Sequence, residues 1–174
     1  RFVLSNVYDL PEVLDEPGRY DIVFTSYGVL CWLPDLPRWA RVVADFLRPG
    51  GSFYIVDGHP AGTIFDDREG VTDLKVDFPY FQTAEPMRFG PGPSYTGDGA
   101  STTTESYEWV HPMSEILNSI ISAGLTIEFL HEFPFAGYKA YPMMERGEDG
   151  WWRLPEHQES VPLLFSLKAT KPSH

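Results

Sequence analysis

The chain has 174 residues, of which 43% are hydrophobic and 22% are charged, and its formal net charge at pH 7 is -12. This length and this ordinary balance predict one packed domain over residues 1–174 and exclude a fibrous or disordered protein. The negative charge and the scattered Lys and Arg residues argue against nucleic acid as a partner, because the phosphate backbone would be repelled.

The first part of the chain is predicted to alternate strands with a helix. Residues 2–6 have the length and composition of a short strand, and residues 20–26 form an apolar run typical of a parallel strand covered on both faces. Asp35 can cap a helix whose apolar residues recur at steps of three and four. Residues 48–51 end that helix, and residues 52–57 form the next strand. This order predicts a right-handed parallel crossover.

Regular periodicity is lost from Gly58 to about Ser101, where proline and glycine are frequent. Two segments of this region, residues 78–81 and 103–110, could pair as antiparallel strands or ribbons. We interpret residues 58–110 as a lid inserted into the domain.

The periodic pattern returns at Pro112, which is expected as the first residue of a helix that Gly124 ends. Residues 125–133 then predict a strand, and residues 162–170 predict a last one after a second irregular stretch.

Four blocks of sequence follow one another in a familiar order. They are residues 2–11, residues 20–33, Phe46-Leu47-Arg48-Pro49-Gly50-Gly51, and residues 119–132 with Ala123-Gly124-Leu125 at their centre. Together they resemble the class I S-adenosylmethionine-dependent methyltransferase family over nearly the whole chain. The third block is the most specific, since it resembles the Leu-Lys-Pro-Gly-Gly turn before the family's fifth strand. The resemblance implies an α/β fold with a Rossmann-like sheet.

The resemblance places the chain on strands three to seven of the family, truncated at the N-terminus. The family's glycine-rich first strand and turn, and the acidic residue that ends its second strand, belong upstream of Arg1. In the family order 3-2-1-4-5-7-6, strands four, five, seven and six can form one sheet with residues 20–26 as an exposed apolar edge. Such an edge invites pairing with another chain, which predicts a homodimer, a swapped sheet or a complementary polypeptide.

The resemblance also implies S-adenosylmethionine as methyl donor, with S-adenosylhomocysteine as product. Ligands bind beyond the carboxyl ends of parallel strands. There Asn6 would accept from the adenine amine while the Val7 N–H donates to a ring nitrogen; the alternative is that Asn6 only caps a turn. Ser26 and Tyr27 would lie below the sulfonium. Tyr27 and Trp32 could wall the donor pocket through cation–π attraction, although core packing competes for Trp32.

Candidates for acceptor chemistry are fewer. His59 could act as a general base, and an ordinary loop histidine is an equal alternative. Tyr107, Trp109 and His111 alternate, so in an extended segment they would share one face and line the substrate site, or else pack the insertion onto the sheet. Cys31 is interpreted as a small apolar filler. No group of carboxylates and histidines has the spacing of a metal site.

The remaining features suit a cytoplasmic protein. A single cysteine fits a reducing compartment and excludes an internal disulfide. No apolar run reaches the roughly 18 residues of a membrane span, and no export signal is visible at Arg1.

The function predicted from the sequence is therefore transfer of a methyl group to a small-molecule acceptor, mainly by positioning. The alternative is a non-catalytic fragment or a binding and oligomerisation module that keeps the methyltransferase fold. A nicotinamide reductase is a weaker rival, because no Tyr-x-x-x-Lys pair stands on a predicted helix.

Overall fold

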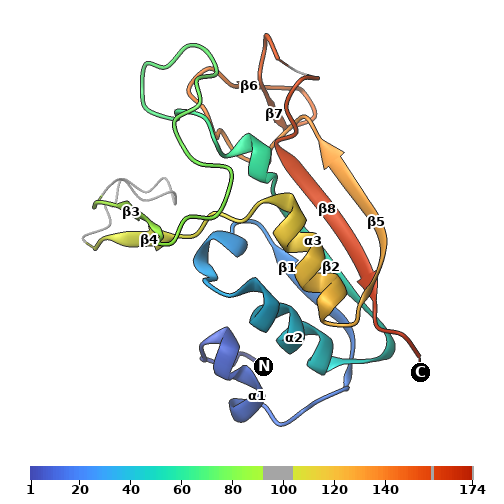
Figure 1. Ribbon diagram of the computed structural model, residues 1–174. Coiled ribbons are helices and arrows are strands. Elements are labelled where there is room, and N and C mark those ends of the chain that lie inside the picture. Colours follow the sequence, from blue (N-terminus) through green and yellow to red (C-terminus); the bar gives the residue numbers. More distant parts are fainter. Residues whose placement is uncertain (92–103, 158, 174) are drawn as a thin grey trace.

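The structure is a computed structural model that describes residues 1–91, 104–157 and 159–173. Within these residues the main sheet has four strands, in the order β1 (Tyr20–Ser26), β2 (Leu47–Gly58), β8 (Leu164–Thr170) and β5 (Thr126–Phe133) (Figure 1). β1 and β2 are parallel, whereas β8 is antiparallel to both β2 and β5. The predicted order of these four strands, with residues 20–26 at the edge, is confirmed.

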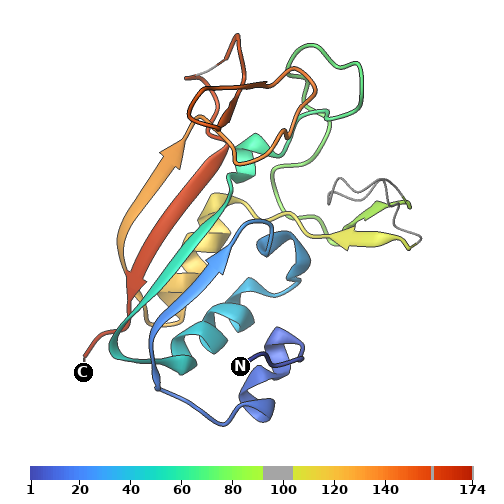
Figure 2. The same ribbon diagram turned by 180° about the vertical axis from the view of Figure 1, so that it is seen from behind.

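Two helices, α2 (Leu36–Phe46) and α3 (Met113–Ser122), cover one face of the sheet (Figure 2). Asp35 caps α2 as predicted, since its Oδ1 accepts the Arg38 N–H at 2.8 Å. Pro112 is the residue before α3 and not its first residue, and Gly124 follows the helix with a φ of +83°. Between helices and sheet lies the main core, which includes the buried side chains of Leu36, Trp39, Phe53, Ile55, Ile116, Ile120, Phe165 and Leu167.

The turn predicted at residues 48–51 lies inside β2. The helix ends at Phe46, and the strand begins at once, with an irregularity in its register to β1 between Tyr20 and Ile22. A Cβ on Gly51 would lie 2.9 Å from the Tyr20 carbonyl oxygen, so only glycine lets β1 approach here.

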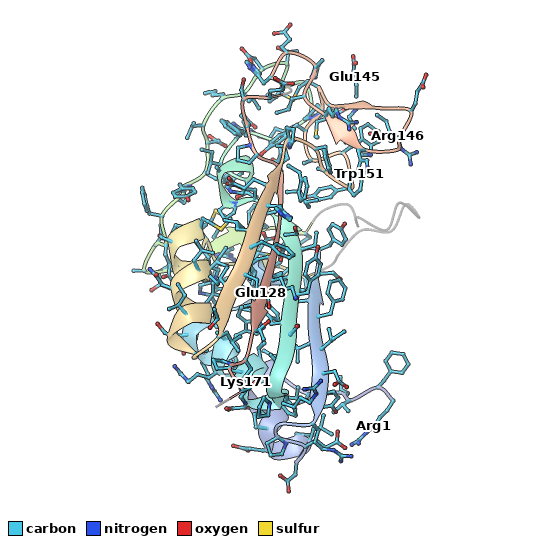
Figure 3. The ribbon with its side chains drawn as sticks, turned by 90° about the vertical axis from the view of Figure 1, so that its right-hand side faces the viewer. Arg1, Glu128, Glu145, Arg146, Trp151 and Lys171 are labelled. Atoms are coloured by element: carbon cyan, nitrogen blue, oxygen red, sulfur yellow. The ribbon has the colours of Figure 1, made fainter. Side chains whose placement is uncertain are left out.

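The opposite face of the sheet carries no helix among the described residues, as the side view in Figure 3 shows. Ile22 is 65% exposed and Phe24 is 58% exposed. Aromatic rings continue across this face, because Phe24 stacks on Tyr54, and Tyr54 contacts Phe129 edge to face. Within the part of the chain that the structure describes, the sheet is therefore covered on one side only, and the prediction that residues 20–26 are covered on both faces is wrong.

The prediction of a strand at residues 2–6 is wrong. Phe2 and Leu4 are fully exposed, and the segment leads into two short helical turns, η1 (Val7–Asp9) and α1 (Leu10–Val13). A strand needs a neighbour for its N–H and C=O groups, and this segment pairs with none of the four strands. η1 packs instead on the start of α2, where the Tyr8 hydroxyl bonds to the backbone of Asp35.

The predicted lid, residues 58–110, begins with a 3-10 turn, η3 (Pro60–Gly62), and contains a ribbon that projects from the sheet (Figure 1). Its strands are β3 (Met87–Phe89) and β4 (Ser106–Glu108). The expected partner, residues 78–81, is wrong: in that segment the Tyr80 hydroxyl accepts the Met113 N–H at the start of α3. Residues 78–81 are therefore joined to α3 by a side-chain hydrogen bond and form no strand with β4.

A second ribbon, β6 (Glu145–Arg146) and β7 (Trp152–Arg153), lies beyond the carboxyl ends of β1 and β2 (Figure 1). It is held by a smaller core of Ala136, Tyr141, Met144, Leu154 and Leu163. In the described part of the chain no helix has the length and apolar character that crossing a membrane requires.

Candidate functional site

The turn after β1 is held by one buried carboxylate at the end of β2. Asp57 is 5% exposed, and its Oδ1 accepts the Gly28 N–H at 2.6 Å. Its Oδ2 accepts the N–H groups of Val29 at 3.1 Å and Leu30 at 3.3 Å. The Gly58 N–H adds a fourth bond, to Oδ1 at 2.8 Å. Asp57 therefore ties the carboxyl ends of two neighbouring strands into one unit.

The backbone of this turn is left-handed at two successive residues. Tyr27 has a φ of +45°, and Gly28 has a φ of +74°. For tyrosine this conformation costs about 1–2 kcal/mol, which the bonds to Asp57 offset. The Tyr27 N–H also donates to the Val56 carbonyl at 2.8 Å. The result is a fixed turn that leaves the Tyr27 ring 52% exposed at the strand end.

The short helical turn η2 (Leu30–Trp32) follows and meets the β3–β4 ribbon. The Trp109 N–H donates to the Cys31 carbonyl at 2.8 Å. Burial raises the pKa of the Cys31 thiol to about 12, and the negative charges of Glu108 and Asp57 add to this effect. The backbone bond sets the end of β4, which carries the half-buried Glu108, against η2. With its raised pKa, Cys31 is a poor nucleophile, as the sequence predicted.

Aromatic residues from the second ribbon approach the same turn. A side chain built on Gly137 would begin 3.8 Å from the Tyr27 ring and 3.7 Å from the Trp151 ring, so both rings lie against this glycine. Trp151 in turn contacts Phe135, and Figure 3 shows Trp151 beyond the ends of the strands. Tyr138, next to Gly137, is 63% exposed. The aromatic side chains of Tyr27, Trp151 and Phe135 thus lie next to the turn that Asp57 holds.

Ser26 and Trp32, which the sequence predicted to contact the methyl donor, lie on either side of the turn that Asp57 holds. Ser26 ends β1, half-buried and in register with Val56 of β2, directly before the Asp57-held turn. Trp32 is 51% exposed, so the alternative of core packing does not apply to it. The structure therefore groups Ser26, Tyr27 and Trp32 at the carboxyl end of β1.

Asn6 lies elsewhere and does not end a strand. Its Oδ1 accepts the Tyr8 N–H at 3.0 Å, which caps η1 as the turn-capping alternative expected. Val7, the first residue of η1, packs partly against the main core. Arg1 pairs with Glu16 at the end of the sheet opposite to Trp151 (Figure 3).

His59 is 4% exposed, and its ring is occupied by the chain itself. Nδ1 accepts the Ala61 N–H at 3.1 Å, which caps η3. Nε2 lies 2.7 Å from Glu132 Oε1, off the line that a good hydrogen bond requires. Burial lowers the pKa of His59, and the Glu132 charge opposes this. Because Glu132 belongs to β5, at the opposite edge of the sheet from β1, His59 turns away from the Asp57-held turn.

The three alternating residues of the ribbon do not share one environment. Tyr107 is exposed, with its hydroxyl near Glu105. His111 is buried, with Nε2 2.7 Å from the Leu33 carbonyl and Nδ1 3.0 Å from Glu115, so it joins η2 to α3. The expectation of one shared face is wrong because regular β4 ends at Glu108, after which the alternation no longer applies.

Glu108 is the residue that sequence reasoning missed. Alternation along β4 was used to group Tyr107 with Trp109, and the same alternation places Ser106 and Glu108 on the other face. That second face is the half-buried one. No group of three metal-binding side chains occurs among the described residues.

Comparison with known proteins gives the fold a name. No family model matches the chain. A structure from Listeria monocytogenes described as an S-adenosylmethionine-dependent methyltransferase superposes with a TM-score of 0.60 at 15% identity, covering 96% of this chain and 67% of that one. An S-adenosylmethionine-dependent methyltransferase from Mesorhizobium loti gives 0.55 at 20% identity, covering 89% and 63%. The geranyl diphosphate C-methyltransferase of Streptomyces coelicolor gives 0.51 at 13% identity, covering 98% and 53%.

Among curated proteins, a CTP synthase of Carboxydothermus hydrogenoformans is 40% identical over 45 residues, which are 26% of this chain and 8% of that protein. So short a match has no bearing on the fold. The structural matches show that the chain has the class I S-adenosylmethionine-dependent methyltransferase fold and spans 53% to 67% of those three structures.

The role of Asp57 can be tested by substitution. Asp57→Ala leaves four N–H groups without their acceptor, so we expect a loss of about 2–4 kcal/mol in the free energy of unfolding, measured in urea. Asp57→Asn, which keeps one acceptor oxygen, should lose less. Asp45→Asn on the exposed side of α2 is the control and should lose under about 0.5 kcal/mol. Equal stability of all three variants would contradict the assignment.

The closeness of Cys31 and Glu108 predicts thiol reactivity. With a pKa of about 12, Cys31 should react with iodoacetamide at pH 8 about 1,000-fold more slowly than an unstructured cysteine, since the thiolate is the reacting form. Glu108→Gln removes a negative charge and should lower the thiol pKa, which speeds alkylation. Glu105→Gln, on the opposite face of β4, should leave the rate unchanged. A fast wild-type reaction would disprove the described enclosure.

Proposed function

We propose that the chain takes part in methyl transfer from S-adenosylmethionine to a small-molecule acceptor in the cytoplasm. The observation that carries this proposal is the Asp57-held turn at the carboxyl ends of β1 and β2, in a sheet with the methyltransferase fold. Such strand ends are where open α/β sheets bind ligands. Similar structures support the choice of donor, since the geranyl diphosphate C-methyltransferase of Streptomyces coelicolor holds S-adenosyl-L-homocysteine together with geranyl diphosphate.

The residues in and around the turn after β1 are suited to contact the sulfonium side of S-adenosylmethionine. Tyr27 and Trp32 are exposed aromatic residues, and Tyr27 adjoins the turn held by the buried Asp57. Aromatic faces attract a sulfonium by about 0.5–2 kcal/mol. The Ser26 side chain would contact the donor from the strand end. Asn6 and Val7 remain our candidates for adenine; the Asn6 oxygen keeps a second lone pair beside the one that caps η1.

Methyl transfer is an in-line displacement, so positioning and exclusion of water are the main tasks of the protein. We assign the acceptor side to the surface formed by η2 and the end of β4, with Tyr107 and Trp109 as the ribbon's contributions. His59 and His111 are assigned as supports of η3 and of the η2–α3 junction, because their rings are held by the chain.

The competing hypothesis is a binding or oligomerisation module with the methyltransferase fold and no catalysis. It is favoured by the exposed edge of β1. Calorimetry with the donor and its product separates the two hypotheses.

We expect S-adenosylhomocysteine to release heat on binding to the 174-residue chain, and Asn6→Ala to weaken it about fivefold through loss of one hydrogen bond. Trp32→Ala should weaken S-adenosylmethionine about 2- to 30-fold and the uncharged product less, because only the donor carries the sulfonium. Asn118→Ala on the exposed side of α3 is the control. No heat at millimolar ligand would favour the binding module.

We also propose that β1 pairs with a second copy of the chain through its free edge. Ile22 and Phe24 are exposed and apolar beside it. Sedimentation should show a mass that rises with concentration, and Ile22→Lys should shift the species toward monomer. Val76→Lys, at a residue 63% exposed outside the sheet, should not. A monomer at every concentration would refute this assembly.

A further inference from the structure

We propose that the methyl acceptor is an amine, protonated in solution, and that Glu108 both binds its ammonium group and takes its proton before transfer. This inference rests on the proposed function and names the substrate class of the same site.

The first support is where β4 places Glu108. Arg88 and Tyr107 are paired across the ribbon and share its exposed face, whereas Glu108 pairs with Met87 and lies on the other face. The next residue, Trp109, bonds to the Cys31 carbonyl and so fixes the end of β4 against η2. Glu108 is therefore held beside the turn that follows β1, half-buried.

The second support is charge. Two other carboxylates of the same segment have basic partners: Glu105 pairs with Arg88, and the buried Asp66 pairs with Arg68 at 2.5 Å. Among residues 1–91, 104–157 and 159–173, no Lys, Arg or His lies within ion-pair distance of Glu108. A cation from outside the protein is the natural partner for a half-buried carboxylate, since burying an unpaired charge is unfavourable.

The third support is the set of groups around Glu108. Asp67 raises the pKa of Glu108 further, after the larger effect of burial. Burial raises the pKa of Tyr138, and the charges of Asp57, Cys31 and Glu108 raise it further. Trp109 follows Glu108 directly, so an ammonium group bound here would have an aromatic side chain close to the carboxylate.

The chemistry then requires a base. An ammonium nitrogen has no lone pair, so its proton must leave before the nitrogen can attack. Glu108 accepts that proton, and its raised pKa makes the carboxylate a better base than an exposed glutamate. The nitrogen lone pair forms the bond to the methyl carbon, the carbon–sulfur bond breaks, and its electron pair stays on sulfur as a neutral thioether. A neutral alcohol would leave the carboxylate unpaired.

The test compares benzylamine with benzyl alcohol, which has the same shape and no charge. Binding to the full chain is followed by two-dimensional NMR of the tryptophan indole N–H groups at pH 7. We expect benzylamine to bind at least fivefold more tightly than the alcohol. Glu108→Gln should remove that preference, and Glu105→Gln should keep it. Asp67→Asn, at an exposed position less able to disturb the fold, should reduce the preference partly.

The same variants are titrated with S-adenosylhomocysteine. Unchanged product affinity in Glu108→Gln, with loss of the amine preference, supports the proposal. An amine preference that depends on Glu108 in a chain that binds no product supports the amine site and refutes methyl transfer by this chain. Equal binding of amine and alcohol to the wild type, or no effect of Glu108→Gln, overturns the amine proposal whether or not the product binds.

Discussion

One buried carboxylate organises the end of the sheet where β1 and β2 finish. Asp57 accepts four backbone N–H groups, three of them from the turn after the neighbouring strand, and it holds that turn in a left-handed conformation unusual for tyrosine. Together with the bond from the Tyr27 N–H to the Val56 carbonyl, this acceptor fixes the turn and the start of η2 to the sheet. The ends of β1 and β2 and the exposed Tyr27 are arranged around it, and the backbone contact of Cys31 with the ribbon fixes η2 from the other side.

Much of the fold was predictable because its strands are written as apolar runs that end at polar or glycine residues. β1, β2, β5 and β8 and their order followed from these runs and from the family resemblance. The segment at Phe2 was predicted incorrectly, since composition alone cannot tell whether an extended segment has a neighbour to pair with. The predicted strand partner of β4, residues 78–81, was also wrong. In that segment the Tyr80 hydroxyl accepts the backbone N–H of Met113 at the start of α3.

The site was predictable only where residues are fixed by a strand end. Ser26, Tyr27 and Trp32 were placed at the end of β1 by sequence, and they lie there. His59 attracted a functional hypothesis because histidine titrates near neutrality, and His111 because it alternates with Tyr107 and Trp109. The contact of His59 with Glu132 and that of His111 with Leu33 join elements far apart in sequence, which local patterns do not reveal. The position of Glu108 beside Cys31 likewise depends on a ribbon about 75 residues away in sequence, a separation no local pattern encodes.

The place of β8 has a consequence for how the chain folds. It lies between β2 and β5, although it comes after both in sequence. Until β8 is inserted, β2 and β5 have no shared ladder, so the two halves of the sheet remain separate units. The pairings between β2 and β8 join residues more than 100 positions apart, as in Phe53 with Ala169. Large loops must close before they form, which predicts slow, late consolidation and an intermediate open to strand exchange with other chains.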